Sequence, residues 1–320
     1  MILTYFLFVI GFILLIKGAD WLVDGASSLA KKMKISAIVI GLTIVAFGTS
    51  MPEFVVNILA GIKGTADIAL GNILGSNIIN ILLILGISAV IYPLTVKKNT
   101  AWKEIPLAIL VVVVLWIMSS DVFIDNARAS FLSRADGLIM LLFFFIFLCY
   151  IFSISIGQRE PEQENKIKEY SGFISWLMIF GGLVFLIFGG KWIVDGAVLI
   201  AKSLGVSESL IGLTIVAIGT SLPELATSVT AAWKKNSDIA IGNIIGSNIF
   251  NIFWVLGFTA FISPLPIPSG ASVDIFITLV VTLVLFVFVL TGSKYKLSRK
   301  QGITFIILYI IYIIYLIKRG

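Results

Sequence analysis

The residues best suited to chemistry are two glutamates, each of which follows a Thr-Ser pair and a proline about halfway along an apolar segment. The two motifs read Gly48-Thr49-Ser50-Met51-Pro52-Glu53 and Gly219-Thr220-Ser221-Leu222-Pro223-Glu224. A charged side chain at the centre of a bilayer costs about 3 kcal/mol or more, so it marks a functional site by default. Two such glutamates in matching motifs argue against a purely structural role.

Oxygen atoms are concentrated around both glutamates. A proline inside a helix leaves the carbonyl four residues earlier without its partner and loosens neighbouring carbonyls, such as those of Ala46 and Ala217. Because Thr49 and Ser50 precede Glu53 by four and three residues, the spacing predicts that hydroxyls and carboxylate share one helix face. A simple proline kink would explain the hydroxyls but not the glutamate. Carbonyl, hydroxyl and carboxylate oxygens are the ligands that Na⁺ and Ca²⁺ prefer.

A second pair of motifs runs from Gly71 to Asn80 and from Gly242 to Asn251. Ser76 and Asn80 are four residues apart, as are Ser247 and Asn251, so each pair predicts a further face of oxygen ligands. The remaining asparagines of these motifs suit interhelical hydrogen bonds as well as ion contact, and the sequence leaves both roles open for Asn72, Asn77, Asn243 and Asn248.

The elements that carry these motifs are membrane helices. The chain of 320 residues is 59% hydrophobic and 12% charged, whereas soluble domains carry roughly 25% charged residues. Apolar runs of about 20 residues recur along it, which predicts an all-α integral membrane protein. It has no histidine, which excludes His-ligated zinc and His general-base catalysis. We expect ten transmembrane helices at roughly 2–29, 36–61, 68–92, 103–119, 131–156, 172–201, 207–233, 239–262, 273–291 and 301–317.

An internal repeat organises these helices. When the sequence is shifted by 171 residues, Gly41–Gly86 aligns with Gly212–Gly257 without gaps and 27 of the 46 positions are identical. The repeat spacing holds five helices, an odd number, so the second copy must enter the membrane upside down. We expect a first repeat at 1–157, a cytoplasmic linker at 158–170 and a second repeat at 171–320. Transporters with inverted repeats bind their substrate near the bilayer midplane, where the copies meet.

The positive charges in the loops predict how the helices are oriented in the membrane. Of the 23 Lys and Arg residues, 15 lie in the loops after odd-numbered helices, six lie after even-numbered helices or in the C-terminal tail, and two lie within helices. The positive-inside rule then places both termini outside the cell, in a multi-pass protein of the cell membrane. The same loop lysines explain the net charge of +6, so the lipid bilayer is the expected partner and nucleic acid is not.

Other acidic residues of the helices have simpler interpretations. Asp24 and Asp195 occupy matching positions near helix ends and suit either a vestibule or ion pairs, such as one between Lys191 and Asp195. Asp136 stands near the start of a helix, where the membrane interface is expected.

Across both repeats, the sequence closely resembles the cation/calcium exchanger superfamily and, within it, the sodium/calcium exchangers of prokaryotes. The two GTS-x-PE and two GSN-I-x-N segments carry the resemblance. It implies four central cation sites and two helices, the first and the sixth, that slide over a core of eight. The implied metal ligands are the side chains of Thr49, Ser50, Glu53, Ser76, Asn80, Thr220, Ser221, Glu224, Ser247 and Asn251, with the backbone oxygens of Ala46 and Ala217.

One departure from the resemblance limits the charge of the site. Some relatives carry aspartate at the position of Asn80 or Asn251, including potassium-dependent exchangers. Here both residues are asparagine, which leaves two carboxylates and argues against potassium co-transport. The short linker also excludes the large regulatory insert of animal exchangers.

The sequence therefore predicts a secondary antiporter that exchanges Na⁺ for Ca²⁺, with no cofactor and no obligatory protein partner. A Ca²⁺/H⁺ antiporter of the same fold, with Glu53 and Glu224 as proton carriers, is the alternative. A uniporter or channel fits inverted repeats with broken helices less well. An intramembrane hydrolase would lack a histidine base, and a structural scaffold would have no use for two costly buried glutamates.

Overall fold

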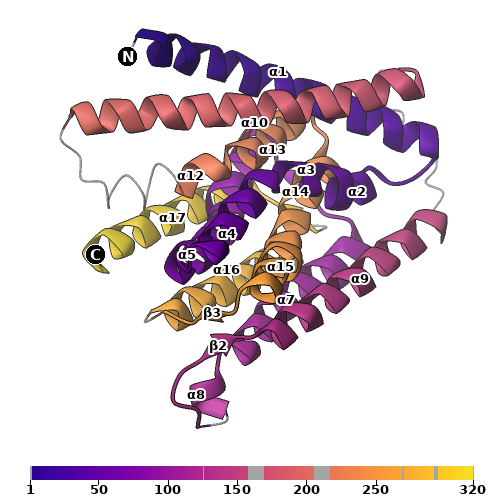
Figure 1. Ribbon diagram of the computed structural model, residues 1–320. Coiled ribbons are helices and arrows are strands. Elements are labelled where there is room, and N and C mark those ends of the chain that lie inside the picture. The colour runs from indigo at the N-terminus through magenta and orange to yellow at the C-terminus, as the bar shows by residue number, and fades with distance from the viewer. Residues whose placement is uncertain are drawn as a thin grey trace.

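The computed structural model describes residues 2–124, 126–157, 169–204, 217–268, 270–291 and 295–319, and this part of the chain is almost wholly helical (Figure 1). Eight of its helices are long and apolar enough to cross a membrane, or nine if one bent pair counts as a single span. The prediction of an all-helical membrane protein is confirmed. The predicted linker, apart from residues 169 and 170, and the first ten residues of the helix predicted at 207–233 lie outside the described residues.

The first half of the chain ends with the long helix α9. Its elements are α1 (Ile2–Met33), α2 (Ala37–Ile40), η1 (Gly41–Val45), α3 (Ala46–Thr49), α4 (Met51–Ile62), α5 (Ala66–Ile79), η2 (Asn80–Leu85), α6 (Gly86–Ile91), β1 (Leu94–Thr95), η3 (Thr100–Glu104), α7 (Ile105–Met118), α8 (Asp121–Ile124), β2 (Phe131–Leu132) and α9 (Arg134–Gly157).

The second half repeats much of this order. Its elements are α10 (Gly172–Ser203), α12 (Ala217–Thr220), α13 (Leu222–Trp233), α14 (Ser237–Ile249), η5 (Phe250–Leu256), α15 (Gly257–Ile262), β3 (Leu265–Pro266), α16 (Ala271–Thr291), β4 (Lys296–Leu297) and α17 (Arg299–Arg319). The elements named η are π-helical turns, which the apolar periodicity did not predict. They begin directly at Asn80 and one residue before Asn251, so both asparagines stand where the helix widens.

The short strands correct one predicted boundary. The helix expected at 131–156 begins instead at Arg134, because Phe131 and Leu132 pair with Pro266 and Leu265. A second antiparallel pair joins Leu94 and Thr95 to Leu297 and Lys296. Both pairs tie loops of the two halves together at the ends of the helix bundle.

Both proline motifs break their helices at the serine. Helices Ala37–Thr49 and Met51–Ile62 meet at an angle of 47°, so the kink predicted at Pro52 is confirmed. Ser50 has φ −83° and ψ 8°, and Ser221 has φ −86° and ψ 7°. Pro52 and Pro223 then stand in the first turn of α4 and α13, where their missing N–H costs nothing because that position has no helical partner. Each glutamate therefore lies in the first turn of a new helix.

The helices α1 and α10 form a separate layer across the others (Figure 1). They pack through glycines: a Cβ on Gly18 would lie 2.7 Å from the carbonyl oxygen of Gly182, and a Cβ on Gly11 would lie 2.9 Å from that of Gly189. Since Gly11 faces Gly189 and Gly18 faces Gly182, the two helices run antiparallel. Small residues at such contacts let helix backbones approach closely. The seven-residue spacing of these glycines is a signal of this contact in the sequence.

Beneath this layer, α5 and α14 occupy the core. In the most apolar window of the spans Ala66–Ile91 and Ser237–Ile262, 78% and 94% of the residues are buried, against 33% and 28% for α1 and α10. The two GSN-I-x-N motifs therefore lie inside the protein, next to the broken helices that carry the glutamates.

Candidate functional site

The structure brings the two predicted glutamates and the four predicted serines together in one buried cluster. Glu53 and Glu224 are fully buried, and Ser50, Ser76, Ser221 and Ser247 surround them through the hydrogen bonds described below. The other predicted side chains for which the structure gives an exposure are buried as well, namely Thr49, Asn80, Thr220 and Asn251. Ala46 is buried, and its carbonyl accepts hydrogen bonds from Ser50 N at 3.0 Å and Thr49 Oγ1 at 3.4 Å. Ala217 opens α12, and its side chain is outside the described set.

The hydroxyls reach the glutamates across the two halves. Ser50 donates to Glu224 Oε1 at 3.1 Å, and Ser221 donates to Glu53 Oε1 at 3.3 Å. Ser50 thus bonds to the glutamate of the other half rather than to Glu53 of its own motif. The helix breaks between them, which turns the serine toward the glutamate of the other half.

A second hydroxyl reaches each glutamate from its own half. Ser76 on α5 donates to Glu53 Oε1 and Ser247 on α14 donates to Glu224 Oε1, both at 3.4 Å. One oxygen of each carboxylate thus accepts two hydroxyls, and neither half can complete this arrangement alone.

Four other oxygens of the predicted ligands accept no hydrogen bond within the described structure. They are Glu53 Oε2, Glu224 Oε2, Asn80 Oδ1 and Asn251 Oδ1, all of them buried. Buried polar groups without partners are costly, and charged ones most of all. All four are acceptors, and a cation is the kind of partner that such oxygens bind. Within the described residues no group of three or more His, Cys, Asp or Glu side chains gathers, so the cluster has two carboxylates.

The threonines and the ambiguous asparagines also bond across the halves. Thr49 donates to Asn243 Oδ1 at 3.0 Å, and Thr220 donates to Asn72 Oδ1 at 3.2 Å. Asn77 and Asn248 bond to each other's backbone carbonyls. The structure thus assigns interhelical hydrogen bonds to all four asparagines whose role the sequence left open. Their shared presence in both repeats was the signal for this role.

The remaining acidic residues lie elsewhere. Asp24 forms an ion pair with Lys234, which also pairs with Asp20 Oδ1 at 2.6 Å. The ion pair suggested for Lys191 and Asp195 is absent from the ion pairs of the described residues. Asp136 accepts hydrogen bonds from Ser133 N and Oγ at the start of α9. None of these residues reaches the glutamates.

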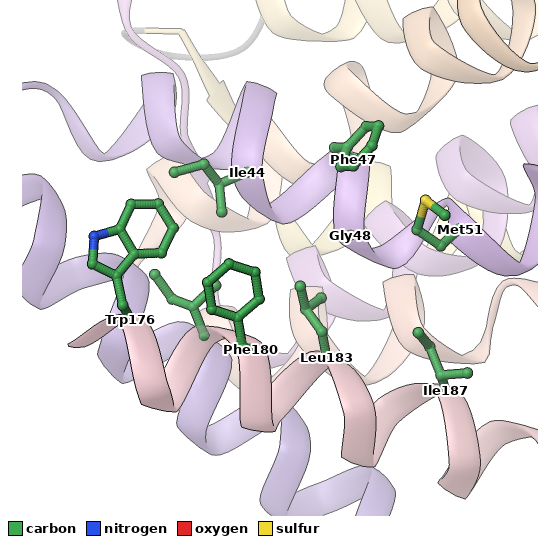
Figure 2. A pocket seen from close by; sticks show the side chains of 9 residues that line it. Ile44, Phe47, Gly48, Met51, Trp176, Phe180, Leu183 and Ile187 are labelled. Atoms are coloured by element: carbon green, nitrogen blue, oxygen red, sulfur yellow. The ribbon is translucent and has the colours of Figure 1, made fainter. Parts of the chain in front are cut away.

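A cavity of about 420 Å³ lies beside the break between α3 and α4, but it is not the ion site. Figure 2 shows its walls, with Phe47 and Met51 on one side and Phe180, Leu183 and Ile187 of α10 on the other. The lining is apolar, so it offers a cation no ligands. The cavity lies between α10 and the broken helix, which also touch closely, since a Cβ on Gly48 would lie within 3.0 Å of the Leu183 side chain.

Comparison of the sequence and the structure with known proteins finds matches in one family of membrane transporters. The sequence model of the family described as sodium/calcium exchanger protein matches residues 3–153 and 174–318. The putative antiporter CaxA of Alkalimonas amylolytica is 40% identical over 94% of both chains. The sodium/calcium exchanger MaX1 of Methanosarcina acetivorans is 31% identical over 96% of both. Solved structures of the sodium-calcium exchanger NCX_Mj are similar as well. One soaked with 10 mM Na⁺ and no Ca²⁺ has a TM-score of 0.83 at 35% identity and covers 98% of each chain.

Proposed function

Because the chain belongs to the sodium/calcium exchanger protein family, we propose that it is a secondary antiporter that exchanges Na⁺ for Ca²⁺ at the buried cluster of Glu53 and Glu224. The observation that carries the proposal is the set of four buried acceptor oxygens without hydrogen-bond partners, two from carboxylates and two from asparagine amides. Hard cations prefer such oxygen ligands.

The proposed ligands come equally from both halves. Glu53 and Glu224 supply the charge, and Asn80 and Asn251 supply amide oxygens. The hydroxyl oxygens of Thr49, Ser50, Ser76, Thr220, Ser221 and Ser247 complete the set, with the backbone oxygens of Ala46 and Ala217 for Na⁺. The hydroxyls that already bond to the carboxylates keep lone pairs for a cation.

The electrostatics of the cluster explain why the protein would exchange ions rather than leak them. Two carboxylates in a low-dielectric interior repel each other strongly unless cations lie between them. One Ca²⁺ or several Na⁺ neutralise the pair, whereas an unloaded site carries two uncompensated charges. Only loaded states would then cross between the two sides of the membrane.

The proposed architecture is ten transmembrane helices in two inverted repeats at 1–157 and 171–320, joined by a cytoplasmic linker, with both termini extracellular. Two observations support it. The helices α1 and α10, which match in the repeat, run antiparallel along their glycines. The two breaks at Ser50 and Ser221 have the same backbone geometry. We further propose that α1 and α10 shift as one unit over the remaining helices to alternate access.

Uptake of ⁴⁵Ca²⁺ into proteoliposomes tests this proposal. Vesicles preloaded with Na⁺ are compared with matched vesicles that carry only a pH gradient. We expect rapid uptake in the first set, and background uptake in both sets when the protein carries Glu53→Gln. Uptake driven by the pH gradient alone would overturn the sodium assignment in favour of Ca²⁺/H⁺ antiport at the same cluster.

A further inference from the structure

Two asparagines behind the cluster hold each other in a fixed orientation. Asn77 Nδ2 donates to the backbone carbonyl of Asn248 at 3.2 Å, and Asn248 Nδ2 donates to the carbonyl of Asn77 at 3.3 Å. A carbonyl oxygen can only accept, so each side chain must present its NH₂ group to the other backbone. Both Oδ1 atoms therefore point the other way.

These two oxygens orient the next pair of amides. Asn251 Nδ2 donates to Asn77 Oδ1 at 3.0 Å, and Asn80 Nδ2 donates to Asn248 Oδ1 at 2.9 Å. With the nitrogens of Asn251 and Asn80 directed at acceptors, their own oxygens are the atoms left for the cluster. Those oxygens are two of the buried acceptors that have no hydrogen bond. We name these four residues, Asn77, Asn80, Asn248 and Asn251, the amide lattice.

We propose that Asn77 and Asn248 are positioning residues of the cation site, which make Asn251 and Asn80 present oxygen rather than NH₂ to the ion. The inference rests on the proposed function. Each positioning residue orients a ligand of the other half: Asn77 of the first half orients Asn251 of the second, and Asn248 of the second half orients Asn80 of the first.

The lattice also determines which residue type the ligand positions accept. A carboxylate at 251 would set an oxygen against Asn77 Oδ1, and two acceptors at that distance repel. The same conflict would arise between a carboxylate at 80 and Asn248 Oδ1. The lattice thus keeps these two ligands neutral and holds the cluster at two carboxylates.

Equilibrium binding of ⁴⁵Ca²⁺ to the purified full chain tests the inference through pairs of substitutions. Asn77→Leu removes both bonds of the Asn77 side chain, and we expect the Kd for Ca²⁺ to rise by about 10–100-fold, as for outer-shell partners of metal ligands. In an Asn251→Ala background the ligand that Asn77 orients is gone, so Asn77→Leu should change Kd by less than about threefold. In an Asn80→Ala background its effect of about 10-fold or more should remain. Asn248→Leu should show the reverse dependence.

An equal effect of Asn77→Leu in both alanine backgrounds would mean that Asn77 only packs the helices, and would overturn the inference. Asn77→Ser serves as a milder variant with the same expected dependence should the leucine variant not fold. Thr259→Val is the matched control, because Thr259 is buried and its hydroxyl bonds, among the described residues, to Val255 O one turn earlier; the Kd of this variant should equal that of the wild type. Wild-type protein that binds no Ca²⁺ would overturn the proposed function itself. Wild-type binding without the crossed dependence would overturn this inference alone.

Discussion

The buried cluster and the α1–α10 layer that lies across it are held together in opposite ways. In the cluster the bonds that join serines to glutamates come in matching pairs from the two halves, as the bonds Ser50–Glu224 and Ser221–Glu53 illustrate. The two helices of the layer instead pack on each other through glycine backbones. Polar bonds between the halves fix the geometry of the cluster, whereas the glycine contacts hold α1 and α10 to each other, as the proposed movement of the pair as one unit requires.

The two helices of the layer also differ in the ion pairs that join them to the core. Lys234, at the end of α13, binds Asp20 and Asp24 of α1. In the repeat these residues match Lys63, Lys191 and Asp195. Because a lysine replaces one acid, the same two-carboxylate contact cannot form with α10, and no ion pair is found there among the described residues. The serine–glutamate bonds of the core are matched between the halves, and the attachment to the layer is not.

The largest expected effect concerns the symmetry of the cluster. Glu53→Gln and Glu224→Gln each remove one of two carboxylates, and we expect each to lower Na⁺-driven ⁴⁵Ca²⁺ uptake by about 100-fold or more, beyond the 10–100-fold typical of outer-shell partners. Initial uptake rates in proteoliposomes, at equal amounts of reconstituted protein, measure this. If one variant retained most of its activity, the two halves would not contribute equally and the contrast with the layer would fail.

A smaller effect is expected from the glycine contact. In Gly182→Ala the new Cβ would lie 2.7 Å from Gly18 O, so the α1–α10 pair must separate, and overpacking of this kind costs about 1–3 kcal/mol. We expect a lower melting temperature and slower uptake, with the Ca²⁺ affinity unchanged because the glutamates lie in the other layer.

The neighbouring residue supplies the control for this contact. In Gly181→Ala the new Cβ would lie 3.4 Å from the Trp21 ring, an ordinary contact. That variant should match the wild type in melting temperature and uptake. A loss of Ca²⁺ affinity in Gly182→Ala would show that the layer shapes the cluster directly.

A few-fold effect is expected where the layer is tied to the core. Lys234→Met removes the cation between Asp20 and Asp24 and leaves two acids facing each other, which weakens the attachment of α1. We expect the uptake rate to change by about two- to fivefold, as for one partly exposed ion-pair contact, with the Ca²⁺ affinity unchanged. Lys235→Met is the control, since Lys235 is exposed and makes no ion pair in the described structure. Identical uptake rates for both variants would show that the ion pairs of Lys234 do not affect transport.

Local patterns in the sequence predicted much of this molecule, and contacts between distant segments set the limit. The prolines predicted the kink confirmed at Pro52, and the apolar runs predicted the membrane helices. The spacing of Ser50 and Glu53 could not predict that Ser50 bonds to Glu224, because this bond joins residues 174 apart in the sequence. The contact of Lys234 with α1 joins residues 210 apart in the sequence, so no local pattern could reveal it.

The smallest effect is expected inside the layer, where Lys31 near the end of α1 pairs with Glu169, just before α10. Both groups are exposed, and the hydrogen bond from Lys31 lowers the pKa of Glu169 below its ordinary value. A lowered folded-state pKa gives stability that is present above the unfolded pKa and is lost as the pH falls through the folded pKa. Glu169→Gln should therefore melt at or slightly below the wild-type temperature at neutral pH, and the difference should disappear as the pH falls through the lowered pKa of Glu169. Because this pair links the two helices of the layer to each other and not to the core, uptake should be unchanged. A slower Glu169→Gln exchanger would show that bonds within the layer also control the movement.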